Sequence, residues 1–436
     1  MSELVTSQKS VLIVGCGIFG LASALEFAQK GYQVTAIDIY EPPSPWSASC
    51  DYNKIVRAEY ENDIYSKLSV EAIELWKNDP KFDGIYNNCG RVMITPMSFK
   101  GRQEFERIGI ENLQKLGKAL DIEYFKGGKK MSTRFPFLKY NSLKSDEQSK
   151  FNPYGGLAHS SNAMIAVYNE AKQLGVKFIF GDDGYAKSIT EINGQAAVVC
   201  KSGKTYTSDN IIVGLGANTG RLIDLKDQQS ATGLFVTFIK LTDDEYLKFK
   251  ECAVLFDAEM GYFFPPDPKT KLLKIALPGI GSCNKVNDPH SLSNKKISLP
   301  RFKNLNPNDT IPKHGEIEAK LLLAKYIPEL AYHKLIDSKI CWIGDTQDSD
   351  FIIDLIPGYK NLYVASGDSG HAFKFLPNIG KYIVNKVEGK LDPTLNKMWS
   401  WKSGTGFDPS KCSWRVSNYY PDLSEIDFLK DVKAKL

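Results

Sequence analysis

The order of apolar and polar positions near the N-terminus predicts a strand, a turn, a helix and a second strand. Residues 11–14 form an uninterrupted apolar run, which is typical of a strand buried on both faces of a parallel sheet. A helical pattern covers residues 21–30 and stops at Gly31, a residue type that commonly ends helices. A second apolar run at residues 34–37 completes the unit.

The turn between the first strand and the helix is rich in glycine. Its sequence is Gly15-Cys16-Gly17-Ile18-Phe19-Gly20, with glycines at the G-x-G-x-x-G spacing. The first glycine permits the tight turn, the second lets the backbone approach a pyrophosphate, and the third lets the helix lie close to the strand. Asp38 lies 23 positions after Gly15, where a carboxylate can bond the hydroxyls of an adenosine ribose. These features predict an adenine dinucleotide site over a plain tight turn, and they do not distinguish NAD from FAD.

A polar segment follows this unit. A proline-rich turn at residues 41–46 leads into residues 47–57, which include Lys54 and Arg57. Two cations three residues apart, close in sequence to the nucleotide turn, fit an anion-binding or flavin-contacting segment. A solvated loop has the same composition, so the pattern alone leaves both interpretations open.

The middle of the chain alternates between helical and strand patterns. A buried strand at residues 210–213 breaks into a turn of small residues at 214–220. Flavoproteins with two dinucleotide folds use such a turn where the backbone passes the cofactor again, so this turn favours FAD over NAD. The other predicted elements are helices at 63–77, 99–120 and 163–174 and strands at 91–95 and 176–180.

Residues 233–277 are rich in aromatic and β-branched residues, and their short runs predict an antiparallel sheet. Lys274 stands among apolar residues in the last of these runs. It is either a lysine on the wet face of a strand or a buried cation, and strand alternation does not decide between the two. The predicted strands are 234–239, 253–256, 261–264 and 272–277.

Composition places the chain among ordinary soluble proteins. Its 436 residues suggest about two domains, with 42% hydrophobic and 24% charged residues. No apolar run approaches the length that spans a membrane. A net charge of +4, from 55 basic and 51 acidic residues, gives no reason to expect a nucleic acid partner.

Cysteine usage and the C-terminus bear on the compartment. The eight cysteines form no C-x-x-C pair and no metal spacing, so reduced intracellular thiols are expected and no metal site is predicted. The chain ends in Ala434-Lys435-Leu436, a variant of the peroxisomal S-K-L signal that an import receptor reads. A frayed polar tail is the alternative. We expect a peroxisomal protein, because the chemistry inferred below would produce hydrogen peroxide.

Two stretches near the C-terminal end carry a specific resemblance. Residues 340–354 precede a buried strand at 362–365, and the turn at 367–374 leads into a predicted helix at 377–387. With the glycine turn, these stretches make the chain resemble the FAD amine oxidases of the monomeric sarcosine oxidase and amadoriase family. That family includes fructosyl amino acid, saccharopine and pipecolate oxidases.

The resemblance implies an α/β fold, α+β overall, in two domains. One is a glutathione-reductase-like Rossmann domain for FAD, built from residues 1–88, 152–224 and 335–391. The other is a substrate domain with a mixed or antiparallel sheet, built from residues 89–151 and 225–334, and residues 392–436 form a C-terminal extension. We expect the protein to act as a monomer.

The resemblance also implies roles for single residues. Cys341 matches the cysteine that bonds covalently to the flavin 8α-methyl group, although a buried core thiol is the alternative. Lys274 matches a lysine above the flavin ring that assists the reaction with oxygen, where a fixed cation stabilises developing superoxide charge. Lys374 matches the lysine that receives the substrate carboxylate at a helix mouth. Lys54 and Arg57 take the places of two basic residues near the flavin and the substrate.

Further positions follow from the same match. Asn53, before Lys54, is similar to the residue found there in fructosyl amino acid oxidases and is a third candidate catalytic residue. Arg415 matches a second carboxylate-binding arginine of amadoriases. The remaining predicted cofactor contacts are Ser47, Val176, Gly216, Asp345, Gly370, His371 and Phe373.

The implied reaction is the oxidation of the C–N bond of a secondary-amine amino acid, by hydride transfer to the flavin and reduction of O2 to H2O2. Fructosyl amino acids are the preferred substrates. Residues 275–279, however, contain no acidic residue that could bind sugar hydroxyls, so saccharopine, pipecolate and N-methyl amino acids remain alternative substrates. A dehydrogenase with an acceptor other than oxygen and a non-catalytic FAD-binding protein are the alternatives from other classes.

Overall fold

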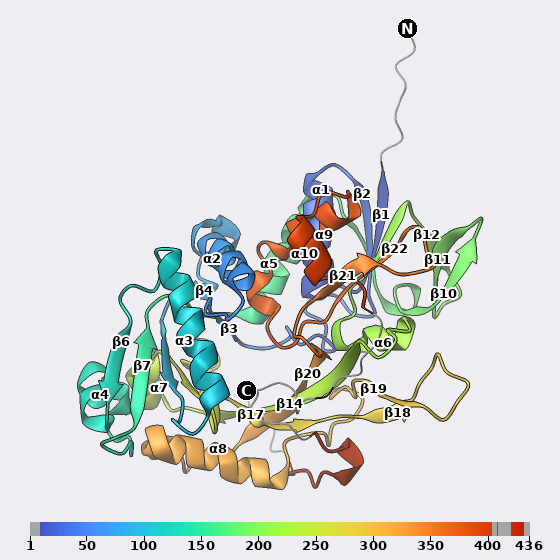
Figure 1. Ribbon diagram of the computed structural model, residues 1–436. Helices are drawn as coiled ribbons and strands as arrows, with labels where there is room; N and C mark the ends of the chain where they lie inside the picture. The colour runs from blue at the N-terminus through green and yellow to red at the C-terminus, as the bar shows by residue number, and fades with distance from the viewer. Residues whose placement is uncertain (1–8, 403–407, 409–419, 431–436) are drawn as a thin grey trace.

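A six-stranded sheet carries the predicted nucleotide unit (Figure 1). The structure is a computed structural model that describes residues 9–402, 408 and 420–430. The strands of this sheet run parallel except the edge strand β21, which is antiparallel to β22. In sheet order they are β21 (Ile352–Leu355), β22 (Leu362–Ser366), β13 (Asn210–Val213), β1 (Ser10–Val14), β2 (Gln33–Ile37) and β9 (Lys177–Ile179).

The strand β1 is buried on both faces, as its apolar run predicts. Val11 and Ile13 pack into the core beneath helices α1 (Ile18–Gln29), α5 (Ser160–Gln173) and α9 (Ile379–Val387). Leu12 and Val14 pack on the opposite side, against a small three-stranded sheet. That sheet consists of β10 (Ala186–Ile192), β11 (Gln195–Cys200) and β12 (Thr205–Thr207).

A second, eight-stranded sheet forms the other half of the molecule, with α8 (Lys313–Tyr326) against it (Figure 1). Its neighbouring strands are antiparallel except β5 and β15, which pair in parallel. In sheet order they are β20 (Ile336–Thr346), β14 (Gln229–Lys240), β17 (Leu272–Ser282), β16 (Gly261–Phe263), β15 (Val254–Asp257), β5 (Arg91–Ile94), β7 (Gln148–Asn152) and β6 (Glu123–Lys126).

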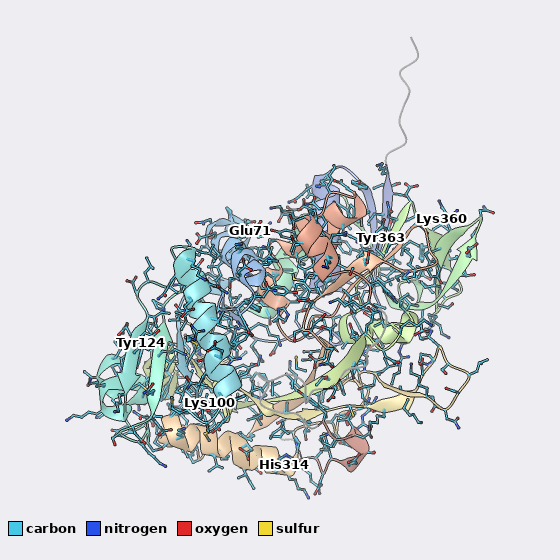
Figure 2. All side chains as sticks on the ribbon, viewed as in Figure 1. Glu71, Lys100, Tyr124, His314, Lys360 and Tyr363 are labelled. Carbon is cyan, nitrogen blue, oxygen red and sulfur yellow. The ribbon has the colours of Figure 1, made fainter. Side chains whose placement is uncertain are left out.

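The predicted fold class is confirmed, because a mainly parallel sheet with helices accompanies a mixed, mostly antiparallel sheet. Tyr124 on β6 and Lys360 before β22 mark opposite ends of the molecule (Figure 2). The remaining described strands and α-helices are β3 (Lys54–Val56), β4 (Tyr86–Asn87), β8 (Gly156–Ala158), β18 (Lys285–Asn287), β19 (Lys296–Ser298), α2 (Asp63–Asn78), α3 (Lys100–Lys115), α4 (Gly128–Arg134), α6 (Thr219–Leu222), α7 (Asp243–Phe249) and α10 (Pro393–Met398).

Two helix boundaries differ from the sequence prediction for identifiable reasons. The helix α1 begins at Ile18 and not at residue 21, because the extended Gly17 caps it and Gly20 already lies within it. The helix α3 ends at Lys115 and not at residue 120. Gly117, with φ +68°, takes the left-handed conformation that stops a helix shortly after Lys115.

One segment of the predicted FAD domain pairs with the eight-stranded sheet. The predicted domain includes residues 335–391, and β20 within that range pairs along its length with β14. The domain boundaries stay a prediction. None of the described helices is long and apolar enough to cross a membrane.

Candidate active site

One cavity is lined by residues of the eight-stranded sheet and by the segments that follow β1, β2, β13 and β22 of the six-stranded sheet. Gly15 has φ +99°, and a Cβ there would lie 2.6 Å from the carbonyl oxygen of Gly214. A Cβ at Gly20 would lie 1.8 Å from the carbonyl oxygen of Gly15, so α1 can approach β1 only with glycine at this position. At Gly17, by contrast, the nearest atom to a Cβ is Ser47 Oγ at 3.7 Å, so this position opens into the cavity.

Asp38 is held at the end of β2 by backbone donors. Its Oδ2 accepts a hydrogen bond from the Cys16 N–H at 2.6 Å, and its Oδ1 accepts one from the Ile39 N–H at 2.6 Å. Burial raises the pKa of Asp38, and the backbone hydrogen bonds oppose that effect. The carboxylate therefore joins the glycine turn to the second strand while it lines the cavity.

A buried carboxylate, Asp51, holds the lysines at the other side of the cavity. Its Oδ2 accepts from Lys274 Nζ at 2.5 Å and from Lys54 Nζ at 2.9 Å, and Lys339 Nζ lies 3.6 Å from Oδ1. Burial alone would raise the pKa of Asp51, but the lysines outweigh it and hold that pKa well below its ordinary value. Asp51 is therefore charged, although only 1% of its side chain is exposed.

The two lysines on Asp51 respond differently to their surroundings. Lys274 is 2% exposed, and burial lowers its pKa to about 8 even though Asp51 opposes the change. Burial also lowers the pKa of Lys54, whose side chain is 19% exposed, but Asp51 and then Cys341 outweigh it and raise that pKa above its ordinary value. Lys54 Nζ also lies 3.5 Å from Cys341 Sγ. The wet-face interpretation of Lys274 and the solvated-loop interpretation of the segment at Lys54 are therefore both wrong.

Lys374 lies buried in a short 3₁₀ helix, Phe373–Phe375, and α9 begins five residues after Lys374, at Ile379. The role of Lys374 at the mouth of this helix stays a prediction. Lys374 Nζ donates to Tyr60 Oη at 2.7 Å and to the His371 carbonyl at 2.6 Å. Burial, then Arg57 and Arg91, lower its pKa well below the ordinary value, and among the described residues no carboxylate forms an ion pair with it.

Most of the predicted site residues meet in this cavity. Asn53 is buried beside it and offers its backbone carbonyl to Lys274 Nζ at 2.9 Å. Gly20, Val176 and Asp345 are not among the residues that line it, and Arg415 and residues 434–436 lie outside the described residues. The predicted residues that line the cavity are Gly15, Gly17, Ile18, Phe19, Asp38, Ser47, Lys54, Arg57, Gly216, Lys274, Cys341, Gly370, His371, Phe373 and Lys374.

Comparison with known proteins agrees with this geometry. A family model described as DAO, FAD dependent oxidoreductase, matches residues 10–386. The chain belongs to this family. L-saccharopine oxidase of Schizosaccharomyces pombe is 36% identical over 97% of this chain and 100% of its own length. Monomeric sarcosine oxidase of Bacillus sp. (strain B-0618) is 23% identical over 86% of this chain and 90% of its own.

A solved structure shows the same fold. The fructosamine oxidase Amadoriase II of Aspergillus fumigatus superposes with a TM-score of 0.87 at 28% identity, over 99% of both chains. The predicted family is therefore confirmed, and the chain is an FAD-dependent amine or amino acid oxidase of the sarcosine oxidase and amadoriase type.

The cavity fits FAD, the cofactor of this family. It is continuous from the glycine turn to Cys341 and Lys374. Gly17 and Gly216 border open cavity space, which a larger side chain at either position would partly fill. The backbone at the start of α1 suits a pyrophosphate and Asp38 suits a ribose. A covalent bond to Cys341 stays a prediction.

Sequence reasoning missed four residues of this site. Asp51 stands three residues before Lys54, a spacing that could have suggested an ion pair. Tyr60, Arg91 and Arg102 gave no such signal, because strand pairing and helix packing bring them to the site from separate segments.

Replacing Asp51 with Asn should destabilise the fold strongly, because it leaves buried Lys274 without its carboxylate. We expect the free energy of unfolding to fall by about 3–5 kcal/mol, measured by urea denaturation. The control is Asp63→Asn, which breaks an ion pair between Asp63 and Lys67 whose side chains are about 60% exposed, and should cost less than about 1 kcal/mol. Equal losses in the two variants would show that the buried cluster contributes no more than a surface pair.

Proposed function

We propose that the protein oxidises the C–N bond of a secondary-amine amino acid and passes the electrons to O2, with H2O2 as product. The observation that carries this proposal is the convergence of Cys341, buried Lys274 and buried Lys374 on the cavity that begins at the glycine turn. FAD, when bound, supplies hydride acceptance and electron transfer to oxygen. The chain supplies orientation and charge.

The substrate carboxylate would bind at Lys374. This lysine is buried beside Arg57 and lacks an ion-pair partner among the described residues, so an incoming carboxylate offsets the cost of its charge. The same cations lower the pKa of a nearby amine, because they disfavour its protonated form. The substrate is thereby held with the neutral nitrogen that oxidation requires.

Lys274 would act on oxygen. Transfer of one electron to O2 develops negative charge, and a fixed cation in a dry site stabilises it. Asp51, Lys54 and Cys341 are among the charged or titratable groups around Lys274, and Asp51 keeps the lysine oriented.

Among the candidate substrates, saccharopine is the first to test. The relative that is 36% identical is a saccharopine oxidase. Ala276, Leu277 and Pro278, shortly after Lys274, line the cavity with apolar groups and offer no acid for a sugar. Fructosyl amino acids remain the second candidate on the strength of the Asn53-Lys54 pair and the likeness to Amadoriase II.

An anaerobic bleaching screen tests this function. Saccharopine, fructosyl-valine, ε-fructosyl-lysine, pipecolate and sarcosine are mixed with the FAD-loaded protein, and flavin absorbance is followed. We expect saccharopine to bleach the flavin fastest and air to restore the colour with release of peroxide. Bleaching without peroxide under air would indicate a dehydrogenase, and no bleaching with any amine would contradict the proposal.

Replacing Lys274 with Met should slow flavin reoxidation by orders of magnitude and change anaerobic reduction much less. In the unchanged protein, reoxidation should slow as pH rises through about 8, because the cation is present below the lowered pKa of Lys274 and lost above it. Stopped-flow mixing of reduced protein with O2 measures both. The control is Lys240→Met, at an exposed position at the end of β14. A pH dependence that persists unchanged in Lys274→Met would assign it to another group.

Covalent attachment of the flavin is tested at Cys341. We expect acid-precipitated protein to stay yellow and Cys341→Ser to release its flavin into the supernatant, because the thioether can no longer form. Cys283→Ser, at a half-buried cysteine away from the cavity, serves as the control. Retention of flavin by Cys341→Ser would place the bond elsewhere.

A further inference from the structure

Three arginine side chains gather in the wall of the cavity around two aromatic rings. Arg57 Cζ lies 5.6 Å from the centroid of Phe105, and Arg102 Cζ lies 4.9 Å from the same centroid. Arg102 Cζ lies 4.9 Å and Arg91 Cζ 5.6 Å from the centroid of Phe256. All three arginines and Phe256 line the cavity. The N-terminal end of α3, which Lys100 marks in Figure 2, brings Arg102 to this cluster.

The carboxylates around this cluster do not balance its charge. Arg91 Nη2 lies 2.9 Å from Glu59 Oε1, and Arg102 Nε lies 3.0 Å from Glu106 Oε1. Glu106 is shared with Lys150, whose Nζ lies 2.6 Å from Oε2. Arg57 donates to the backbone carbonyl of Glu59 and, among the described residues, has no carboxylate in ion-pair contact.

The guanidinium groups of Arg91 and Arg102 are buried, and not all of their donors have hydrogen-bond partners among the described residues. Arg91 is 3% and Arg102 6% exposed, and Arg91 Nε has no hydrogen-bond partner within the described part of the chain. Burial, with help from Arg57 and Arg91 and against Glu106, lowers the pKa of Arg102 to about 10. A cavity wall with this excess of positive charge is suited to an anion.

The cluster is connected to the predicted carboxylate site. Arg57 Cζ lies 4.4 Å from the ring centroid of Tyr60, and the hydroxyl of Tyr60 accepts the hydrogen bond from Lys374 Nζ. A substrate whose first carboxylate reaches Lys374 therefore has the arginine cluster next to it along the cavity wall.

We propose that Arg91 and Arg102 bind a second carboxylate of the substrate, beyond the one that Lys374 receives. The substrate class is then an amine with a dicarboxylic arm on one side of its nitrogen, such as a glutamate-derived secondary amine. This inference rests on the proposed function. The planar guanidinium groups match a carboxylate in two parallel hydrogen bonds, a geometry that lysine does not reproduce.

Diacids that cannot be oxidised test the inference without turnover. Calorimetric titration of the FAD-loaded protein compares glutarate with butyrate, which has a similar carbon chain and one carboxylate. We expect glutarate to bind at least tenfold more tightly, and succinate and malonate to bind progressively less well as the two carboxylates come closer together. Equal affinity for glutarate and butyrate would overturn the inference.

The variant Arg102→Gln tests whether the arginine cluster causes the preference for glutarate over butyrate. We expect it to reduce the ratio of glutarate to butyrate affinity at least fivefold with butyrate affinity unchanged, and Arg102→Lys to keep part of the ratio. The matched control is Arg107→Gln, on an exposed part of α3, which should leave the ratio as in the unchanged protein. A full ratio in Arg102→Gln would overturn the inference, and if that variant does not fold, an undiminished ratio in Arg102→Lys would do so.

The two proposals fail in different ways. If amines are oxidised but glutarate shows no advantage over butyrate, the dicarboxylate site is wrong and the oxidase function stands. If glutarate is preferred but no secondary amine bleaches the flavin, the binding site stands and the proposed reaction is wrong.

Discussion

The arrangement of the site depends on one buried carboxylate that three lysines share. Asp51 lies between β2 and β3, while Lys274 and Lys339 come from β17 and β20 of the eight-stranded sheet. The backbone carbonyl of Asp51 also accepts hydrogen bonds from the hydroxyls of Ser160 and Ser161 at the start of α5. A charged group costs much free energy in a buried position unless it is paired, so these contacts fix the glycine-turn side of the cavity against the substrate side.

The buried charges around Asp51 and around Lys374 are compensated to different degrees. Around Asp51, a carboxylate within the chain compensates the lysines, and their positions are determined before any ligand binds. Around Lys374, the cations outnumber the carboxylates, and burial strongly lowers the pKa of Lys374. The lysines on Asp51 are held in place with or without a ligand. The cations around Lys374 lack such compensation and gain most from a negatively charged substrate.

Local patterns predicted the frame of the fold, because each relies on neighbouring residues. The apolar run at residues 11–14, the glycine turn and Asp38 needed no tertiary information, and the family resemblance supplied Lys274 and Cys341. Whether Lys274 faces water could not be read from alternation, since β17 is buried along most of its length. Arg91 and Arg102 were missed because the parallel pairing of β5 with β15 and the packing of α3 bring them together.

The residues that suit the cofactor and those of the arginine cluster lie on different elements, which suggests how one fold serves different amines. The residues that suit the cofactor lie at the ends of β1, β2 and β13, where the parallel sheet fixes the backbone. The arginine cluster lies on β5, on α3 and after β3, and its charge rests on side chains alone. Under the proposed function, exchange of a single arginine for a neutral residue changes the charge that the wall presents but none of the residues at the strand ends, so substrate choice can vary while the cofactor site is retained.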